Sequence, residues 1–180
     1  MNEHTLRVLE YDRLREIVAG FAASGPGSEA VLAARPATDR SAVELLLGET
    51  QEFLRVLERG EAPPMDGIRD IRSPLAKVAA AGMMLSPAEL LDIAATLGAG
   101  RRIKYFVQRL GKQTPPVPLF SEKADRITPL PPIEEAVQRA IDEKGEVKDS
   151  ASPALRRIRR QISRTRDEVL ERLGLSLIHI

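Results

Sequence analysis

The residues with the clearest chemistry in this sequence are arginines that gather near its end. Residues 152–174 contain seven arginines and three acidic residues, and no lysine. Arg156, Arg160 and Arg164 follow one another at intervals of four, so they share one face if the segment is helical, and Arg159 lies on a neighbouring face. Guanidinium groups in such a row can donate paired hydrogen bonds to phosphates, and binding of that kind weakens steeply with salt.

The same segment also has the pattern of a structural helix. Its apolar residues recur at intervals of three or four, with Thr165 filling one position of the series: Leu155, Ile158, Ile162, Val169 and Leu173. A narrow apolar stripe on a charged helix is typical of a coiled coil or a long projecting helix, whose arginines pair with acids on a neighbouring helix. We favour this interpretation, and we keep Arg156, Arg159, Arg160 and Arg164 as candidate nucleic-acid contacts.

Residues for catalysis or metal binding are sparse. The chain has no cysteine, which excludes a thiolate site. It has only two histidines, one near each end, which leave almost nothing from which to build a histidine-rich metal site or a Ser/His/Asp triad. Asp66 with Asp70, and Glu134 with Glu135, are carboxylate pairs, but among 26 acidic residues such pairs arise by chance. We therefore expect no catalytic, cofactor-binding or metal-binding residue in this chain.

A short loop with charged residues, 67–72, is a further candidate for binding. We expect it to be structural, with Ile68 and Ile71 anchoring it and Asp70 accepting hydrogen bonds from backbone amides.

Composition indicates an all-helical protein. Of its 180 residues 43% are hydrophobic and 29% charged, but only 3% are aromatic, so Leu, Ile, Val and Ala must fill the core. The most frequent residues are strong helix formers. The N-terminus does not resemble a signal peptide, and no stretch approaches the roughly 20 apolar residues of a membrane helix. We expect a cytoplasmic protein.

The spacing of apolar residues predicts several helices. We expect them at these positions: one or two between 6 and 21, then 28–34, 39–59, 87–110, at best a short one within 112–132, 133–143, and a last one from 153. The helix at 39–59 carries an apolar stripe typical of a helix that faces a core: Val43, Leu46, Leu47, Thr50, Leu54 and Leu57. The helix at 87–110 has the clearest start, since Ser86, Pro87 and Glu89 form a capping box with a first-turn proline.

These elements predict an irregular helical core domain over 1–150, at most a minor β segment near 145–150, and a long lever or coiled-coil-like helix over 151–174. The last six residues, 175–180, break the charged pattern with an apolar run. They also resemble the in-frame translation of a transposon-end sequencing adapter. We interpret this segment, which includes His179, as an artefact of sequencing.

Five segments, in this order, resemble one protein family. They are Thr5–Asp12; Arg35–Asp39 with the helix containing Glu44–Leu46; Gly67–Arg72; Leu85–Ala94; and Ile141–Glu143 through Gly145–Val147 to Asp149–Pro153 and Leu155–Arg159. Together they resemble the second-type bacterial paralogue of the MutS mismatch-repair family, which carries an Smr domain. The resemblance covers residue 5 to about 172, which corresponds to the first part of that family's core, or lever, domain.

The resemblance implies a function for a longer parent protein. It implies a homodimeric ATPase that uses ATP and Mg, acts on double-stranded or branched DNA to suppress recombination, and in some members acts on stalled ribosomes and their rRNA. It also implies endonuclease activity from the Smr domain. The fragment would have a mechanical role, as the base of a lever that links nucleotide-driven movement to a distant clamp.

This chain departs from the family by what it lacks. No phosphate-binding G-x-x-x-x-G-K-[ST] loop is present: at the one Gly-Lys pair, Gly111–Lys112, Phe106 occupies the position of the first glycine and Gln113 that of Ser/Thr. Two other functions stay open. One is a self-contained helical module that dimerises through 155–173, and the other is a small basic protein that binds nucleic acid by itself.

Overall fold

The chain folds into helices joined by short linkers. The computed structural model describes residues 3–80 and 82–177, the last four by their backbone alone. These residues form nine α-helices and no sheet, so the all-α class is confirmed. The helices are α1 (Glu3–Val8), α2 (Tyr11–Ala19), α3 (Gly25–Ala33), α4 (Arg40–Glu58), α5 (Arg72–Ala79), α6 (Pro87–Leu110), α7 (Pro118–Asp125), α8 (Pro131–Ala140) and α9 (Pro153–Leu177).

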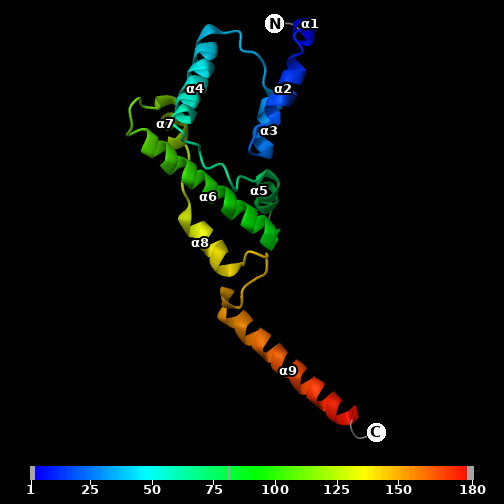
Figure 1. Cartoon of the computed structure of the whole chain (residues 1–180). Coiled ribbons are helices and arrows are strands. Elements are labelled where there is room, and N and C mark those ends of the chain that lie inside the picture. The colour runs from blue at the N-terminus through cyan, green and yellow to red at the C-terminus, as the bar shows by residue number, and fades with distance from the viewer. Residues whose placement is uncertain (1–2, 81, 178–180) are drawn as a thin grey trace.

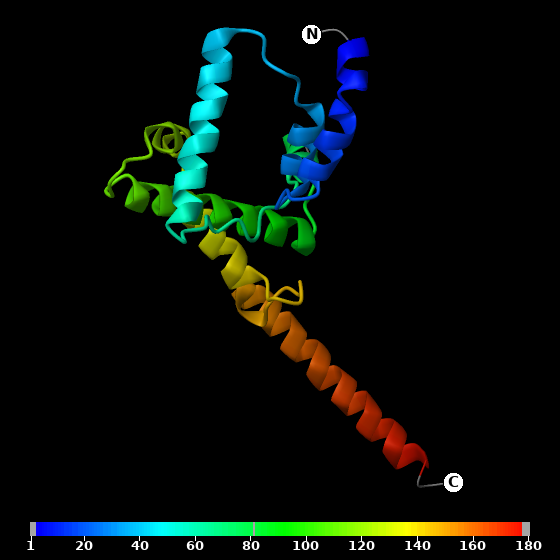
Figure 2. The same cartoon turned by 45° about the horizontal axis from the view of Figure 1, so that its top comes forward.

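Helix α6 is the centre of the molecule. Figure 1 shows it running across the body, with α4 and α7 towards one end, α1–α3 and α5 towards the other, and α8 beneath it. The α9 helix leaves the body and projects away from every other helix in both views (Figures 1 and 2). The predicted body with one long projecting helix is therefore present. The helix α9 reaches Leu177, and residues 178–180 of the suspected adapter segment lie outside the described residues.

Two small clusters of buried side chains hold the body together. The larger lies between α4, α6 and α7 and consists of Val56, Val107, Leu110, Val117 and Ala124, with Ile103, Phe106 and Phe120 packed against it. The smaller joins α6 to α8 through Ala94, Val137 and Ile141. Both clusters use α6, so this helix takes part in all of this core packing.

Helix α6 begins as its sequence predicts. Ser86 Oγ accepts the backbone N–H of Glu89 at 3.3 Å, and the Glu89 carboxylate accepts the N–H of Ser86 at 2.6 Å. The hydrogen bond from the Ser86 N–H, and after it the hydrogen bond from the Lys77 ammonium, lower the pKa of Glu89 below its usual 4.5. The helix then continues without interruption through Gly98 and Gly100, two residues of low helix propensity.

The expected orientation of α4 is wrong. The stripe that its sequence places towards a core is open to water: Leu46 and Leu54 are each 53% exposed and Leu47 is 63% exposed. The buried residues of α4 are Glu52 and Val56, on the other side of the helix. The reason is that α7, the helix that packs along α4 in the described part of the chain, covers that other side.

Several boundaries also differ from the sequence predictions. Helix α5 was missed, because Pro74 and the prolines before it indicate a loop, although a proline is compatible with the first turn of a helix. For the same reason α3 begins at Gly25, with Pro26 in its first turn, and α8 begins at Pro131. The expected β segment is a single antiparallel bridge between Ile141 and Val147.

Helices α1–α3 form a column of their own. Both α1 and α3 pack on α2, and the Arg15 side chain of α2 donates to the carbonyl groups of Leu32 and Ala34 at the end of α3. An exposed ion pair between Glu29 of α3 and Arg72 of α5, at 2.8 Å, links the column to the body. Large apolar side chains of the column stay exposed, including Phe21 at 85%.

Candidate nucleic-acid interface

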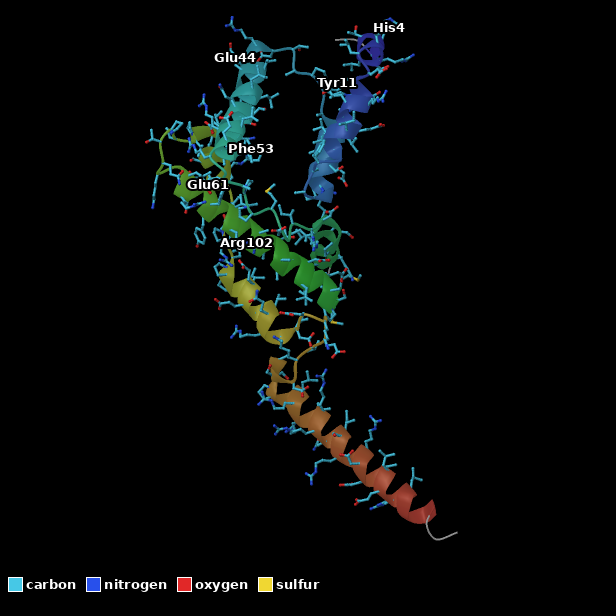
Figure 3. The ribbon with its side chains drawn as sticks, viewed as in Figure 1. His4, Tyr11, Glu44, Phe53, Glu61 and Arg102 are labelled. Carbon is cyan, nitrogen blue, oxygen red and sulfur yellow. The ribbon has the colours of Figure 1, made fainter. Side chains whose placement is uncertain are left out.

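The arginines of α9 are the candidate site that the sequence singled out. Arg156, Arg160 and Arg164 lie on one face of a continuous helix, and all three are exposed. Figure 3 shows the side chains of α9 projecting into solvent, with no other helix beside them. Within the described residues none of the three makes a hydrogen bond or an ion pair. The structure therefore leaves three cationic groups in a row, about 6 Å apart along the axis, free for an anionic partner.

Arg159 does not join this row. Its guanidinium donates to the carbonyl oxygen of Val147 at 2.8 Å and pairs with the Asp149 carboxylate at 2.5 Å. Both partners precede α9, so Arg159 fastens the helix to the turn before it. Arg159, one of the four predicted nucleic-acid contacts, therefore has bonding partners within the chain, and its contact with nucleic acid stays a prediction.

The first turn of α9 is fixed by further hydrogen bonds. Ser152 Oγ accepts the backbone N–H of Leu155 at 3.0 Å, the capping contact expected of a Ser-Pro start. Before it, Lys148 is bonded twice to α8: its backbone N–H donates to the Ala140 carbonyl at 2.8 Å and its ammonium to the Gln138 carbonyl at 2.7 Å. A short 3-10 helix, Asp149–Ala151, packs against both α8 and α9. A chain of polar contacts thus runs from α8 into α9.

The apolar stripe of α9 lies opposite the arginine row. Exposed fractions are 47% for Ile158, 62% for Ile162 and 50% for Val169, so no described element covers the stripe. On a helix of 3.6 residues per turn, the mean direction of these positions is roughly opposite that of Arg156, Arg160 and Arg164. One face of α9 therefore suits an apolar helix, while the other suits an anion.

One carboxylate of each pair from the sequence has a partner within the chain. The Glu134 carboxylate is 5% exposed and accepts hydrogen bonds from Arg101, the shortest of them 2.9 Å, which raises the pKa of Arg101. Glu135, next to it, is exposed. Asp70 bonds the Arg72 side chain, and this bond lowers the pKa of Asp70 from 3.8 to about 2.

The loop at 67–72 is held against α6. The backbone N–H of Arg69 donates to Thr96 Oγ1 at 3.0 Å, and Asp70 Oδ1 accepts the backbone N–H of Arg72 at 3.1 Å. Gly67 has φ +88°, and a Cβ there would lie 3.3 Å from the Ala95 carbonyl oxygen. The predicted hydrogen bond from a backbone amide to Asp70 is confirmed, and the contact with Thr96 favours a structural role for the loop.

The sequence of this chain is similar to known proteins over nearly all of its length. No protein-family model matches the chain. It is 39% identical to Endonuclease MutS2 of Geobacillus thermodenitrificans, over 96% of the chain and 22% of that protein. To Endonuclease MutS2 of Symbiobacterium thermophilum it is 36% identical, over 96% of the chain and 21% of that protein. To Endonuclease MutS2 of Halothermothrix orenii it is 35% identical, over 97% of the chain and 22% of that protein.

The chain belongs to the MutS2 family. It spans about a fifth of the length of these MutS2 relatives, which is consistent with the N-terminal piece that the resemblance predicts. Among the residues described, no group of three or more histidines, cysteines or carboxylates is arranged to hold a metal ion. Nor is any helix there long and apolar enough to cross a membrane.

One important residue of this MutS2 segment escaped the sequence reasoning. Glu52, on α4, is 6% exposed, and its two carboxylate oxygens accept the backbone N–H groups of Leu119 and Phe120, each at 3.1 Å. It thereby caps α7, which has no capping side chain of its own. The sequence offered no signal for this role, because both partners of Glu52 are backbone N–H groups more than 60 positions away in the chain.

Proposed function

We propose that this chain is the helical base of a MutS-type protein that acts on nucleic acid, and that its own role is mechanical. The observation that carries the proposal is the way α9 is rooted. It leaves the body as one helix of 25 residues, about 37 Å long, and its first turns are bonded to the segment that follows α8. A rotation of α8 therefore moves the far end of α9.

The chemistry of the whole protein belongs to parts outside this segment. The relatives are named endonucleases, and that name describes those longer proteins. We propose that the parent of this chain binds ATP and Mg, forms a homodimer and acts on double-stranded or branched DNA. Action on stalled ribosomes and their rRNA is part of the same proposal. The fragment supports these activities by holding and moving a lever, and we propose no catalytic residue within it.

The lever proposal is tested by measuring how firmly α9 is held. The chain has no cysteine, so spin labels can be placed at Gln108→Cys on α6 and Gln161→Cys on α9, both at exposed positions. Pulsed electron resonance is expected to give one narrow distance distribution. Replacing Arg159 by Ala should broaden it, because both bonds to the preceding turn are lost. Arg157→Ala, on the same helix turn and without a described partner, is the matched control.

The outcome that contradicts the lever is a broad distribution in the chain with Arg159 intact. Such a result would mean that α9 swings freely about residues 148–152, and a freely swinging helix cannot transmit a rotation. Equal broadening by Arg157→Ala and Arg159→Ala would also remove the argument, since only Arg159 is bonded to the turn.

A second candidate function is direct binding of a nucleic-acid backbone by α9. The observation that favours it is the row of Arg156, Arg160 and Arg164, which have no ion-pair partner in the part of the chain that the structure describes. Like charges four residues apart destabilise a helix, and bound phosphates would relieve that repulsion. Neutralising three phosphates of a duplex predicts a slope of roughly −2.7 for the logarithm of affinity against the logarithm of salt concentration.

Fluorescence anisotropy with a labelled 30-base-pair duplex measures this second function. Changing Arg156, Arg160 and Arg164 together to Glu is expected to abolish binding. The control changes three exposed arginines elsewhere, Arg7→Glu, Arg35→Glu and Arg126→Glu, and so alters the net charge equally. If both triple variants lose the same affinity, attraction to the net charge explains the binding and α9 is not a specific contact.

A further inference from the structure

The α1–α3 column and the body are separate packing units. The two buried clusters that hold the body together take no residue from the column among the described side chains. The buried apolar residues of the column are Leu6 and Ala19, and they lie in neither cluster. Helices α1 and α3 pack on α2, and in the described chain none of the three packs extensively on a helix of the body. Few buried contacts therefore oppose a movement of the column relative to the body.

The linker between the column and α4 has little to hold it in one conformation. Residues 35–38 lie outside any helix, and their backbone makes no hydrogen bond within the described part of the chain. Figures 1 and 2 both show this linker crossing from the column to α4, which stands apart from it. A backbone without hydrogen bonds changes its dihedral angles at low cost, so residues 35–38 are suited to act as a hinge.

A polar contact joins the column to the body at α5. The guanidinium of Arg72, the first residue of α5, donates through Nη2 to Glu29 Oε1 of α3 at 3.0 Å and lies 2.8 Å from Oε2. The same guanidinium is held from the body by Asp70, whose Oδ1 accepts a hydrogen bond from Arg72 Nε at 2.8 Å. Asp70 therefore fixes the position of Arg72 whether or not Glu29 lies beside it.

The contact between Glu29 and Arg72 is sensitive to salt. Their side chains are 59% and 61% exposed, so dissolved ions reach both. An exposed ion pair shifts an equilibrium by about two- to fivefold, and high ionic strength removes most of that effect. The position of the column beside α5 and a position away from it are therefore both populated, and ionic strength sets their ratio.

We propose that the α1–α3 column is a hinged arm, that residues 35–38 are its hinge, and that Glu29 and Arg72 form a salt-sensitive latch that holds it beside α5. With the latch closed, the arm stands as in Figure 1. When the latch opens, Glu29 moves away with α3 while Arg72 stays bonded to Asp70. The latch closes again without a rearrangement of α5, because its half on the body stays in place. The arm includes neither α8 nor α9, so this inference does not depend on the lever.

The distance between two spin labels reports the position of the arm. The chain has no cysteine, so labels can be placed at Glu16→Cys on α2 and Gln108→Cys on α6, both at exposed positions. At low salt, pulsed electron resonance is expected to show a narrow distance peak from the latched arm above a broad distribution from the open arm. Raising the salt concentration from about 50 mM to about 1 M should lower the fraction in the narrow peak about twofold.

Substitutions in each half of the latch should reproduce the effect of salt. Glu29→Gln leaves α5 unchanged, and Arg72→Gln leaves α3 unchanged. Each is expected to lower the narrow fraction about twofold at low salt and to remove most of its salt dependence. The double variant should have no greater effect than either single one, since both break the same contact. Arg69→Gln is the matched control: it removes an equal charge, but the ion pair of Arg69, with Asp92 at 3.8 Å, lies within the body.

Three outcomes would overturn the proposal. If neither salt nor Glu29→Gln changes the narrow peak, contacts other than the latch hold the column. If Arg69→Gln lowers the narrow fraction as much as Arg72→Gln does, overall charge sets the position of the column. If the parent chain shows no narrow peak at low salt, nothing latches the arm. Each of these results leaves the lever untouched, because the distance between α6 and α9 tests it separately.

Discussion

Glu52 of α4 and Leu119 of α7 are 67 positions apart in the chain, yet a carboxylate oxygen of Glu52 accepts the backbone N–H of Leu119 at 3.1 Å. The other oxygen accepts the N–H of Phe120. A helix N-terminus carries a partial positive charge and unpaired N–H groups, so a buried carboxylate satisfies both needs at once. This contact explains how α4 packs on α7 with a charged residue between them.

Replacing Glu52 by Ala is therefore expected to destabilise the fold. The change leaves two buried N–H groups without an acceptor and should lower the free energy of unfolding by about 2 kcal/mol. Urea denaturation followed by circular dichroism measures the loss. The matched control is Glu49→Ala, one turn earlier, which removes an ion pair to the exposed Lys123 and should cost less than about 0.5 kcal/mol. Equal losses would contradict the capping role.

Leu110 of α6 is buried and Leu46 of α4 is exposed, so replacing each by alanine is expected to affect stability very differently. Leu110 is 1% exposed in the larger cluster, and Leu110→Ala should cost about 3 kcal/mol through the cavity it leaves. Leu46 is 53% exposed, and Leu46→Ala should change stability by less than about 0.5 kcal/mol at concentrations where the chain is monomeric. Urea denaturation followed by circular dichroism measures the loss of stability in both variants. A large loss from Leu46→Ala would mean that the stripe of α4 is already buried.

The orientation of α4 shows where sequence reasoning succeeds and where it fails. Periodicity identifies an amphipathic helix correctly, but it gives no information on which partner covers the apolar face. Here α7 covers the face around Glu52 and Val56, and the more apolar stripe stays open. For α6 the capping residues fix the start and the buried positions follow, because the helices on both sides of it belong to the same chain.

The candidate site shows the same distinction. The sequence placed Arg156, Arg160 and Arg164 on one face, and the structure confirms that placement because four-residue spacing is a property of any helix. It could not show that Arg159 bonds to Val147 and Asp149, since these contacts depend on the path of the turn before α9. Whether the remaining three bind phosphate stays a prediction for the anisotropy experiment.

Acid is expected to weaken the contact between Asp70 and Arg72. The pKa of Asp70 is about 2 in the folded chain against 3.8 in the absence of its partner, because Arg72 donates to the charged carboxylate. A carboxyl group with a lowered pKa stabilises the fold above its unfolded pKa, and that stability is lost as the pH falls from about 4 through 2. A double-mutant cycle with Asp70→Asn and Arg72→Gln should show coupling at pH 5 that disappears near pH 2. Coupling independent of pH would contradict this account.

The last prediction concerns two glycines that share one helix but have different neighbours. Alanine favours a helix interior over glycine by about 1 kcal/mol, and at Gly100 a Cβ would meet Ile127 at an ordinary 3.5 Å, so Gly100→Ala should stabilise the chain by that amount. At Gly98 a Cβ would lie 3.2 Å from Glu134 Oε2. That carboxylate is buried and held by Arg101, so it cannot move aside without weakening its hydrogen bonds. In Gly98→Ala this clash is therefore expected to cancel the gain in helix propensity. Its midpoint urea concentration should be no higher than that of the parent chain. If both alanines stabilise the chain equally, Glu134 is free to move and the close approach of α8 to α6 at Gly98 is not what excludes a side chain there.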